Sequence, residues 1–215
     1  MPPNADAQGA VIALLGAEST GKTTLAHQLA DSLRARGERV ARVDEHLREF
    51  CLRHGRTPRR DEQAALAREQ SRRIAEAART HEVVVADTGA LMIAVYSQLL
   101  FDDDSLLAEA LAEQSRYRAT LLTALDLPWA ADGFIRDGAH ARAPVDALLR
   151  DALLSAGIAF AVVAGGGEQR LANAQRAVDA ALRPAPRGPT RWRAACAECG
   201  DPDCERHLLA RGELS

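Results

Sequence analysis

Residues 16–23, Gly-Ala-Glu-Ser-Thr-Gly-Lys-Thr, constrain the fold of this chain more than any other stretch. They fit the phosphate-binding loop pattern, in which Gly, four residues and Gly-Lys-Ser/Thr join a strand to a helix. The preceding run at residues 11–15 is short and apolar, as in a buried strand. Beyond the loop, Leu25, Leu29 and Leu33 recur at helical spacing. The sequence therefore predicts a strand, a loop and a helix in the order that the motif requires.

This loop predicts a site for ATP and Mg²⁺. Its glycines let backbone N–H groups turn toward a polyphosphate, and the helix N-terminus adds positive charge. Lys22 would reach the β- and γ-phosphates, and the Thr23 hydroxyl would bind Mg²⁺. Lys22 is the only lysine of a chain that otherwise uses arginine, which favours a functional role for it. The expected nucleotide-binding residues are Gly16, Ala17, Glu18, Ser19, Thr20, Gly21, Lys22, Thr23 and Thr24.

Composition excludes several classes of protein. The net charge of -3 provides no overall attraction for nucleic acid or a membrane, and no apolar run is long enough to span a bilayer. The first residues lack the basic and apolar regions of a secretory signal. Nucleotide use without an export signal predicts a cytoplasmic protein, whose cysteines are thiols or metal ligands rather than disulfides. A homo-oligomer is left open.

Short apolar runs alternate with helical patterns, which predicts an α/β domain of the P-loop NTPase class. We expect a five-stranded parallel sheet with helices on both faces at residues 10–182, after a disordered lead at residues 1–9. The strands are expected at residues 11–15, 39–43, 82–86, 119–125 and 158–163. Helices are expected at residues 22–36, 46–54, 61–80, 91–100, 106–116, 144–155 and 168–182.

Acidic residues follow three of the expected strands, at the sheet edge where ligands of α/β proteins bind. Asp87 is a candidate partner for Mg²⁺ or its waters, with a helix cap as the alternative. Asp44 and Glu45 are candidates for the general base that accepts a proton from an attacking hydroxyl. For this pair the alternative is a solvated helix start. Asp126 ends the fourth strand.

Residues 128–142 are rich in Gly, Asp and Arg, which predicts a mobile loop. Arg136 and Arg142 would close over the transferring phosphoryl group and stabilise its charge, or else they are solvated surface arginines. The basic run at residues 53–60 has acidic neighbours and few aromatics. It is therefore predicted to be a solvated helix face, and nucleic acid is not an expected partner.

The C-terminal part differs in composition from the rest of the chain. Residues 183–190 form a Pro-rich linker, and residues 191–215 form a tail with clustered cysteines. Thiolates and imidazole are the ligands that zinc prefers, so the tail predicts one closed, structural zinc site in the manner of a zinc knuckle. The alternative is a tail whose cysteines have no function. The expected ligands are Cys196, Cys199, Cys204 and His207.

Four motifs carry a resemblance to a known family. They are Gly-Ala-Glu-Ser-Thr-Gly-Lys-Thr-Thr-Leu from residue 16, Asp-Glu-His-Leu-Arg-Glu-Phe from residue 44, Ala-Asp-Thr from residue 86 with Tyr96 beyond it, and Asp-Leu-Pro-Trp-Ala-Ala-Asp-Gly-Phe-Ile-Arg-Asp-Gly from residue 126. Together they resemble the kinase domain of NadR-type NAD-biosynthesis proteins, which phosphorylates nicotinamide riboside. The resemblance covers residues 10–182, and the last motif is its most specific part.

The combined prediction is an ATP-dependent kinase acting on the 5′-hydroxyl of a small ribonucleoside, which the resemblance implies is nicotinamide riboside. Asp132 would bind the ribose hydroxyls, and Tyr96 or Trp129 would stack on the base. Two alternatives stay open. One is an ATP-binding regulatory switch whose zinc tail binds a partner, and the other is a kinase for a different nucleoside or nucleotide.

Overall fold

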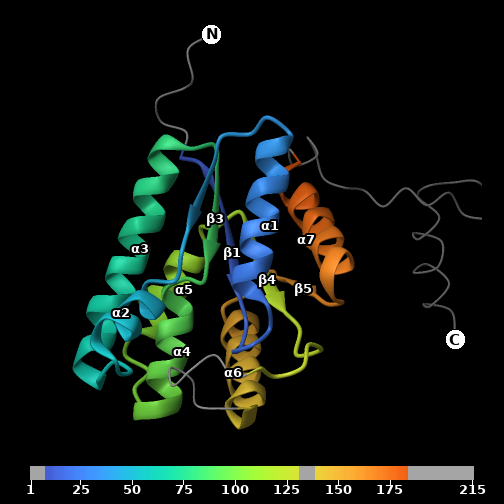
Figure 1. Ribbon diagram of the computed structural model, residues 1–215. Coiled ribbons are helices and arrows are strands. Elements are labelled where there is room, and N and C mark those ends of the chain that lie inside the picture. Colours follow the sequence, from blue (N-terminus) through green and yellow to red (C-terminus); the bar gives the residue numbers. More distant parts are fainter. Residues whose placement is uncertain (1–7, 131–138, 184–215) are drawn as a thin grey trace, which may run out of the picture. The chain divides into compact units, whose positions relative to one another are not determined.

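The chain folds around one sheet of five parallel strands in the order β2-β3-β1-β4-β5 (Figure 1). The structure is a computed structural model that describes residues 8–130 and 139–183. The strands are β1 (Ala10–Leu15), β2 (Val40–Val43), β3 (Val83–Asp87), β4 (Ala119–Thr123) and β5 (Ala161–Val163). This sheet confirms the predicted five-stranded parallel architecture of the P-loop NTPase class.

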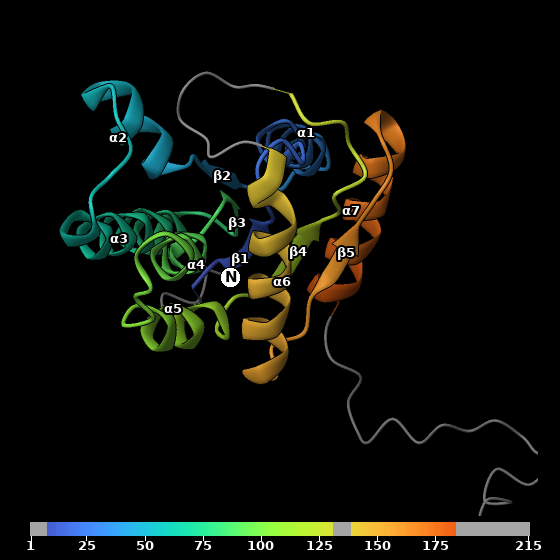
Figure 2. The same cartoon turned by 90° about the horizontal axis from the view of Figure 1, so that it is seen from below.

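Helices cover both faces of the sheet, as predicted (Figure 2). One face packs against α1 (Lys22–Ala35) and α7 (Gly167–Leu182). The other face carries α3 (Gln63–Thr80), α4 (Ala90–Phe101), α5 (Leu107–Gln114) and α6 (Arg142–Ser155). The short helix α2 (His46–His54) and the 3₁₀ turns η1 (Arg60–Glu62) and η3 (Ala139–Ala141) complete the described elements.

The central strand shows why this sequence forms a buried sheet. Successive side chains of a strand point to opposite faces, so Ile12 and Leu14 pack with α1 while Val11 and Leu15 pack under the helices of the other face. Because both faces are covered, β1 is apolar throughout rather than alternating with polar residues.

Several element boundaries differ from the prediction by one to three residues, and two of these differences have a clear physical reason. Helix α6 begins at Arg142, before Pro144, because a proline in the first turn gives up only an N–H that has no helical partner. Strand β5 spans only Ala161–Val163. The expected start of that strand, Ile158, instead donates its N–H to Leu153 at the end of α6, at 2.9 Å.

The connections place a crevice at the carboxyl ends of β1 and β3. From β1 the chain passes to α1 on one face, and from β3 it passes to α4 on the other face. Ligands of open α/β sheets bind where neighbouring strands diverge in this way. All the elements above belong to a compact unit that ends at Leu182. Within the described ranges, no helix has the length and apolar character needed to cross a bilayer.

Candidate active site

The phosphate loop connects β1 to α1 and adopts a backbone that requires glycine. Gly16 and Gly21 have φ angles of 141° and 78°, in a region that L side chains rarely adopt. A Cβ atom on Gly16 would also lie 2.1 Å from Oγ1 of Thr123, so no larger residue fits beside β4. Both glycines of the sequence motif are therefore demanded by geometry as well as by ligand chemistry.

Hydroxyl groups hold the loop to the neighbouring strand. Oγ1 of Thr20 donates to the carbonyl of Ala17 at 2.7 Å and lies 2.7 Å from Oγ1 of Thr123. Thr123 also donates to the carbonyl of Leu15 at 3.2 Å. Because these atoms are buried, the contacts fix the shape of the loop before any ligand arrives.

The start of α1 provides a positively charged end to the loop. Gly21 occupies the N-cap position, and no side chain caps the helix. The first N–H groups of a helix lack helical partners, and together with the helix dipole they form an anion-binding site. Nζ of Lys22 lies over the same loop, where it donates to the carbonyl of Ala17 at 2.7 Å. Backbone donors and one ammonium group therefore gather where a phosphate chain would bind.

Asp87 lies at the end of β3 and has the environment of a cation ligand. It is paired in register with Leu14 of β1, immediately before the phosphate loop. Its side chain is 2% exposed, and its Oδ1 atom is buried without a hydrogen-bond partner. A buried carboxylate oxygen without a donor is costly, and Mg²⁺ binds such oxygens. This carboxylate and the Thr23 hydroxyl in the first turn of α1 are donors of the types that bind a magnesium ion.

The backbone beyond Asp87 is strained. Thr88 has a φ of 78°, which is a rare conformation for a β-branched residue, and its N–H donates to the carbonyl of Leu14 at 3.1 Å. Strain of this kind is retained when the surrounding structure fixes it and is concentrated at functional sites. Here it turns the chain from β3 into α4 beside the phosphate loop.

The two candidate bases have different surroundings. The Asp44 carboxylate pairs with Nε of Arg42 at 2.8 Å, and its side chain is 54% exposed. Glu45, at the N-cap of α2, instead lines a cavity together with Lys22 and Tyr96. Of the two carboxylates, only Glu45 lines the cavity that holds the phosphate-loop lysine.

That cavity, which we call the acceptor pocket, lies between the phosphate loop, α2, the start of α3 and α4. Its enclosed part is small, about 70 Å³. Met92, Tyr96 and Leu100 line it from successive turns of α4, and Cys51 lines it from α2. Burial raises the pKa of the Cys51 thiol, so it behaves as an apolar wall residue.

Other predicted site residues lie outside this pocket or outside the described residues. Arg142 opens α6 and donates to the carbonyl of Leu127 at 2.9 Å. Trp129 is 39% exposed and is not among the lining residues of the acceptor pocket. The remaining predicted site residues lie outside the described ranges, as do the linker and tail beyond residue 183: Asp132, Arg136, Cys196, Cys199, Cys204 and His207. Within those ranges, no three His, Cys, Asp or Glu side chains are grouped to hold a metal ion.

A buried arginine at the same sheet edge was not predicted from the sequence. Arg170 donates to the carbonyls of Val163 and Gly165, at 3.0 and 2.7 Å, and pairs with Asp126. Burial of Asp126 opposes its ionisation, but the Gly165 N–H and the Arg170 guanidinium hold its pKa below the ordinary value. Asp126 therefore joins the end of β4 to the loop after β5 and to α7. Sequence offers no signal for this, because Arg170 lies in an ordinary amphipathic helix.

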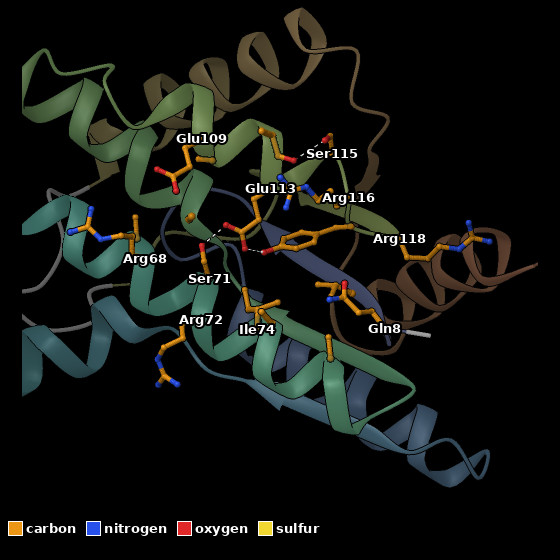
Figure 3. Close-up of a pocket in the computed structure, with 18 of the residues that line it drawn as sticks. Gln8, Arg68, Ser71, Arg72, Ile74, Glu109, Glu113, Ser115, Arg116 and Arg118 are labelled. Carbon is orange, nitrogen blue, oxygen red and sulfur yellow. Dashed lines mark hydrogen bonds between the residues drawn. The ribbon is translucent and has the colours of Figure 1, made fainter. Parts of the chain in front are cut away.

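A larger cavity, of about 920 Å³, lies at the opposite edge of the sheet (Figure 3). It is lined by the first residues of β1 and by Arg118, which precedes β4, so it opens at the amino ends of the strands. Both carboxylate oxygens of Glu113 are occupied there, by hydrogen bonds from Ser71 and Tyr117. This cavity lies away from the phosphate loop, and its central carboxylate links α3 to α5.

Comparison with known proteins agrees with this fold. Two solved structures of NadR proteins, one in complex with NR and one in complex with NAD and AMP-PNP, match with TM-scores of 0.67 and 0.66 at 20% and 21% identity. Each match covers 84% of this chain but only 53% and 52% of the matched chains, so this chain spans about half their length. No curated protein gave a significant match. A family model described as an AAA domain matches residues 11–170, and the chain therefore belongs to this AAA domain family.

Proposed function

We propose that this protein is an ATP-dependent kinase that transfers the γ-phosphoryl group to the 5′-hydroxyl of a ribonucleoside, and that its substrate is nicotinamide riboside. One observation carries the proposal. Lys22 of the phosphate loop lines the same pocket as Glu45 and Tyr96, so a carboxylate and an aromatic ring lie beside the expected place of the γ-phosphate. A protein that only binds or hydrolyses ATP has no need of such a pocket.

The ATP side of the reaction uses the phosphate loop. Backbone N–H groups from Gly16 to Thr24 would hold the phosphates, and Lys22 would neutralise charge on the transferring group. Thr23 and Asp87 would hold Mg²⁺. When bound, this ion bridges and neutralises phosphate oxygens. Because phosphoryl transfer needs little covalent help, positioning and charge stabilisation account for most of the catalysis.

The acceptor side uses the pocket between α2 and α4. Glu45 would accept the proton of the attacking hydroxyl, since it is the candidate carboxylate that lines the pocket beside Lys22. Tyr96 would stack on the base. Arg136, from the segment before α6, and Arg142, the first residue of α6, would approach the phosphates, and Asp132 would bind the ribose hydroxyls.

The substrate assignment draws on two further supports. The sequence motifs resemble NadR-type kinase domains, and the solved NadR proteins that share the fold are in complex with NR and with NAD and AMP-PNP.

The enclosed volume of the acceptor pocket, about 70 Å³, is smaller than that of an ordinary ligand pocket. A nucleoside would therefore have to widen the pocket on binding.

The proposal is tested by measuring ADP formation from ATP and Mg²⁺ across a panel of nucleosides and nucleotides that includes nicotinamide riboside. We expect turnover that depends on a nucleoside and is highest with nicotinamide riboside. Slow ATP hydrolysis that no acceptor accelerates would contradict the proposal and would indicate a regulatory switch. A higher rate with another nucleoside would support the proposed kinase activity but assign it a different substrate.

We also propose that the tail at residues 191–215 binds one structural zinc through Cys196, Cys199, Cys204 and His207. Four such ligands fill the tetrahedral shell of zinc and leave no position for catalysis. Elemental analysis of protein purified without added metal tests this. We expect about one zinc per chain, and less than this after substitution of Cys199 by serine. Zinc near zero with all the thiols titratable would contradict it.

A further inference from the structure

Gln63, the first residue of α3, is a buried polar residue with an unused hydrogen-bonding atom. Its side chain is 2% exposed and lines the acceptor pocket, and its Oε1 atom is buried without a hydrogen-bond partner. Such an atom costs stability, because it gives up its bonds to water and gains none within the protein. An unpartnered buried group calls for an explanation, and a ligand that supplies the missing hydrogen bond is one.

Two other buried glutamines show what an ordinary structural carboxamide does here. Gln70, on the same helix, accepts from the N–H of His46 at 2.8 Å and donates to the carbonyl of Asp44 at 3.4 Å. Gln114, on α5, donates to Oγ1 of Thr120 at 2.8 Å. Each is 1% exposed and uses its amide to join two elements. Gln63 is almost as buried, but its Oε1 atom has no hydrogen-bond partner among the described residues.

The position of Gln63 is fixed by its neighbours. Glu62, one residue earlier, receives two hydrogen bonds from Arg56, at 2.6 and 2.7 Å, and a third from the N–H of Arg59 at 2.7 Å. The Arg56 guanidinium lies 5.4 Å from the ring centre of Phe50 on α2. These contacts fix the turn that begins α3 against α2. The backbone that carries the Gln63 side chain is therefore held in place.

We propose that Gln63 determines which acceptor the kinase binds, by pairing with a carboxamide group on the base of the nucleoside. This inference rests on the proposed function. The reacting hydroxyl must lie beside Lys22 and Glu45, whereas Gln63 enters the pocket from a different wall, at the start of α3. A substrate whose hydroxyl lies there would therefore meet Gln63 with another of its groups.

The chemistry of the carboxamide defines the preferred group. A glutamine side chain offers one acceptor oxygen and one N–H₂ donor, so it pairs through two hydrogen bonds with another primary amide. A carboxylate in the same place has no donor for Oε1 and would bring two oxygens into repulsion. Gln63 therefore favours nicotinamide riboside over nicotinic acid riboside, which differs from it only in having a carboxylate.

The test compares kcat/KM for these two nucleosides in wild type and in Gln63→Leu, with Gln63→Met as a second variant in case leucine is poorly packed. We expect wild type to prefer the amide by at least about tenfold, the usual effect of an unmatched buried hydrogen bond. In Gln63→Leu the preference should fall toward one through a higher KM for the amide, while the KM for ATP stays unchanged. Its Tm should be equal or higher, because an unsatisfied buried atom has been removed.

Gln114→Leu is the matched control, since it removes an equally buried carboxamide that does have a partner. It should lower the Tm and leave the preference between the two nucleosides unchanged. If both Gln63 variants keep the wild-type preference and KM while nucleosides are still phosphorylated, Gln63 is only a packing residue and the proposed function stands. If wild type phosphorylates neither nucleoside, the inference and the proposed function both fail.

Discussion

The Tyr96 hydroxyl on α4 donates a hydrogen bond to Oε1 of Glu18 in the phosphate loop, at 3.2 Å. Glu18 is 8% exposed, and both residues line the acceptor pocket. The contact joins the wall of the acceptor pocket to the loop that would hold ATP. The two halves of the proposed reaction are therefore built on one connected surface, which favours fixed positions for donor and acceptor.

Two substitutions at Tyr96 distinguish the contribution of its hydroxyl group from that of its ring. Tyr96→Ala removes the proposed stacking surface, and we expect the KM for the nucleoside to rise about tenfold or more, since base stacking is worth about 1–3 kcal/mol. Tyr96→Phe keeps the ring and should change that KM by less than about threefold. Trp129→Ala is the control, because Trp129 does not line the pocket. Equal losses for Tyr96→Phe and Tyr96→Ala would show that the ring does not stack on the substrate.

The single lysine allows a direct probe of the phosphate site. Because Lys22 is the only lysine, an amine-selective reagent modifies one side chain besides the N-terminus. ATP with Mg²⁺ should protect Lys22 from this reagent, as followed by peptide mass spectrometry. Lys22→Met should lose at least about 10³-fold in kcat with an unchanged circular dichroism spectrum. A well-folded Lys22→Met protein with near-normal turnover would exclude the proposed role of the loop.

Two aspartates at the same sheet edge are expected to behave in opposite ways. Asp87 has a buried oxygen without a partner, so Asp87→Asn should keep or raise the Tm, while kcat falls about 100-fold and more Mg²⁺ is needed. Asp126 is bound to Gly165 and Arg170, so Asp126→Asn should lower the Tm and leave the Mg²⁺ dependence unchanged. If Asp87→Asn keeps the wild-type rate and the wild-type Mg²⁺ dependence, Asp87 does not bind Mg²⁺ and only caps the following helix.

The turn that holds Gln63 has a measurable pH signature. Hydrogen bonds from the Arg56 side chain and the Arg59 N–H lower the pKa of Glu62 from 4.5 to about 2. Because the folded pKa is depressed, the stabilisation is complete above about pH 4.5 and is lost as the pH falls toward about 2. We expect the ¹³C carboxyl resonance of Glu62 to titrate well below 4.5, and to return toward 4.5 in Arg56→Ala. A wild-type midpoint near 4.5 would show that the turn is not held in this way.

Much of the fold could be predicted because its signals are local. The apolar runs of β1 and β3 and the Gly-Lys-Thr pattern at residues 21–23 each specify structure within a few neighbouring residues. The phosphate loop demands glycine at Gly16, and the sequence has glycine there. Carboxyl ends of parallel strands share one edge, so the placement of Asp87 beside this loop also follows from the order of the elements.

The rest depends on contacts between distant residues, which a single sequence does not specify. Asp44 and Glu45 are adjacent in the sequence and are equivalent candidates for the general base. In the structure, Asp44 pairs with Arg42, whereas Glu45 lines the acceptor pocket. The position of Asp126 at a strand end is typical of a ligand-facing residue, but its carboxylate binds Arg170, which lies 44 residues away in the sequence. Gln63 has no sequence signal at all, because what distinguishes it is the hydrogen bond that it lacks.

The most direct test of phosphoryl transfer beside this loop is ³¹P NMR of a reaction containing the protein, ATP, Mg²⁺ and nicotinamide riboside. We predict a new phosphomonoester signal coupled to the 5′ protons of the ribose, growing in step with ADP and absent with Lys22→Met. Formation of inorganic phosphate alone, at a rate that does not depend on the nucleoside, would contradict the central claim.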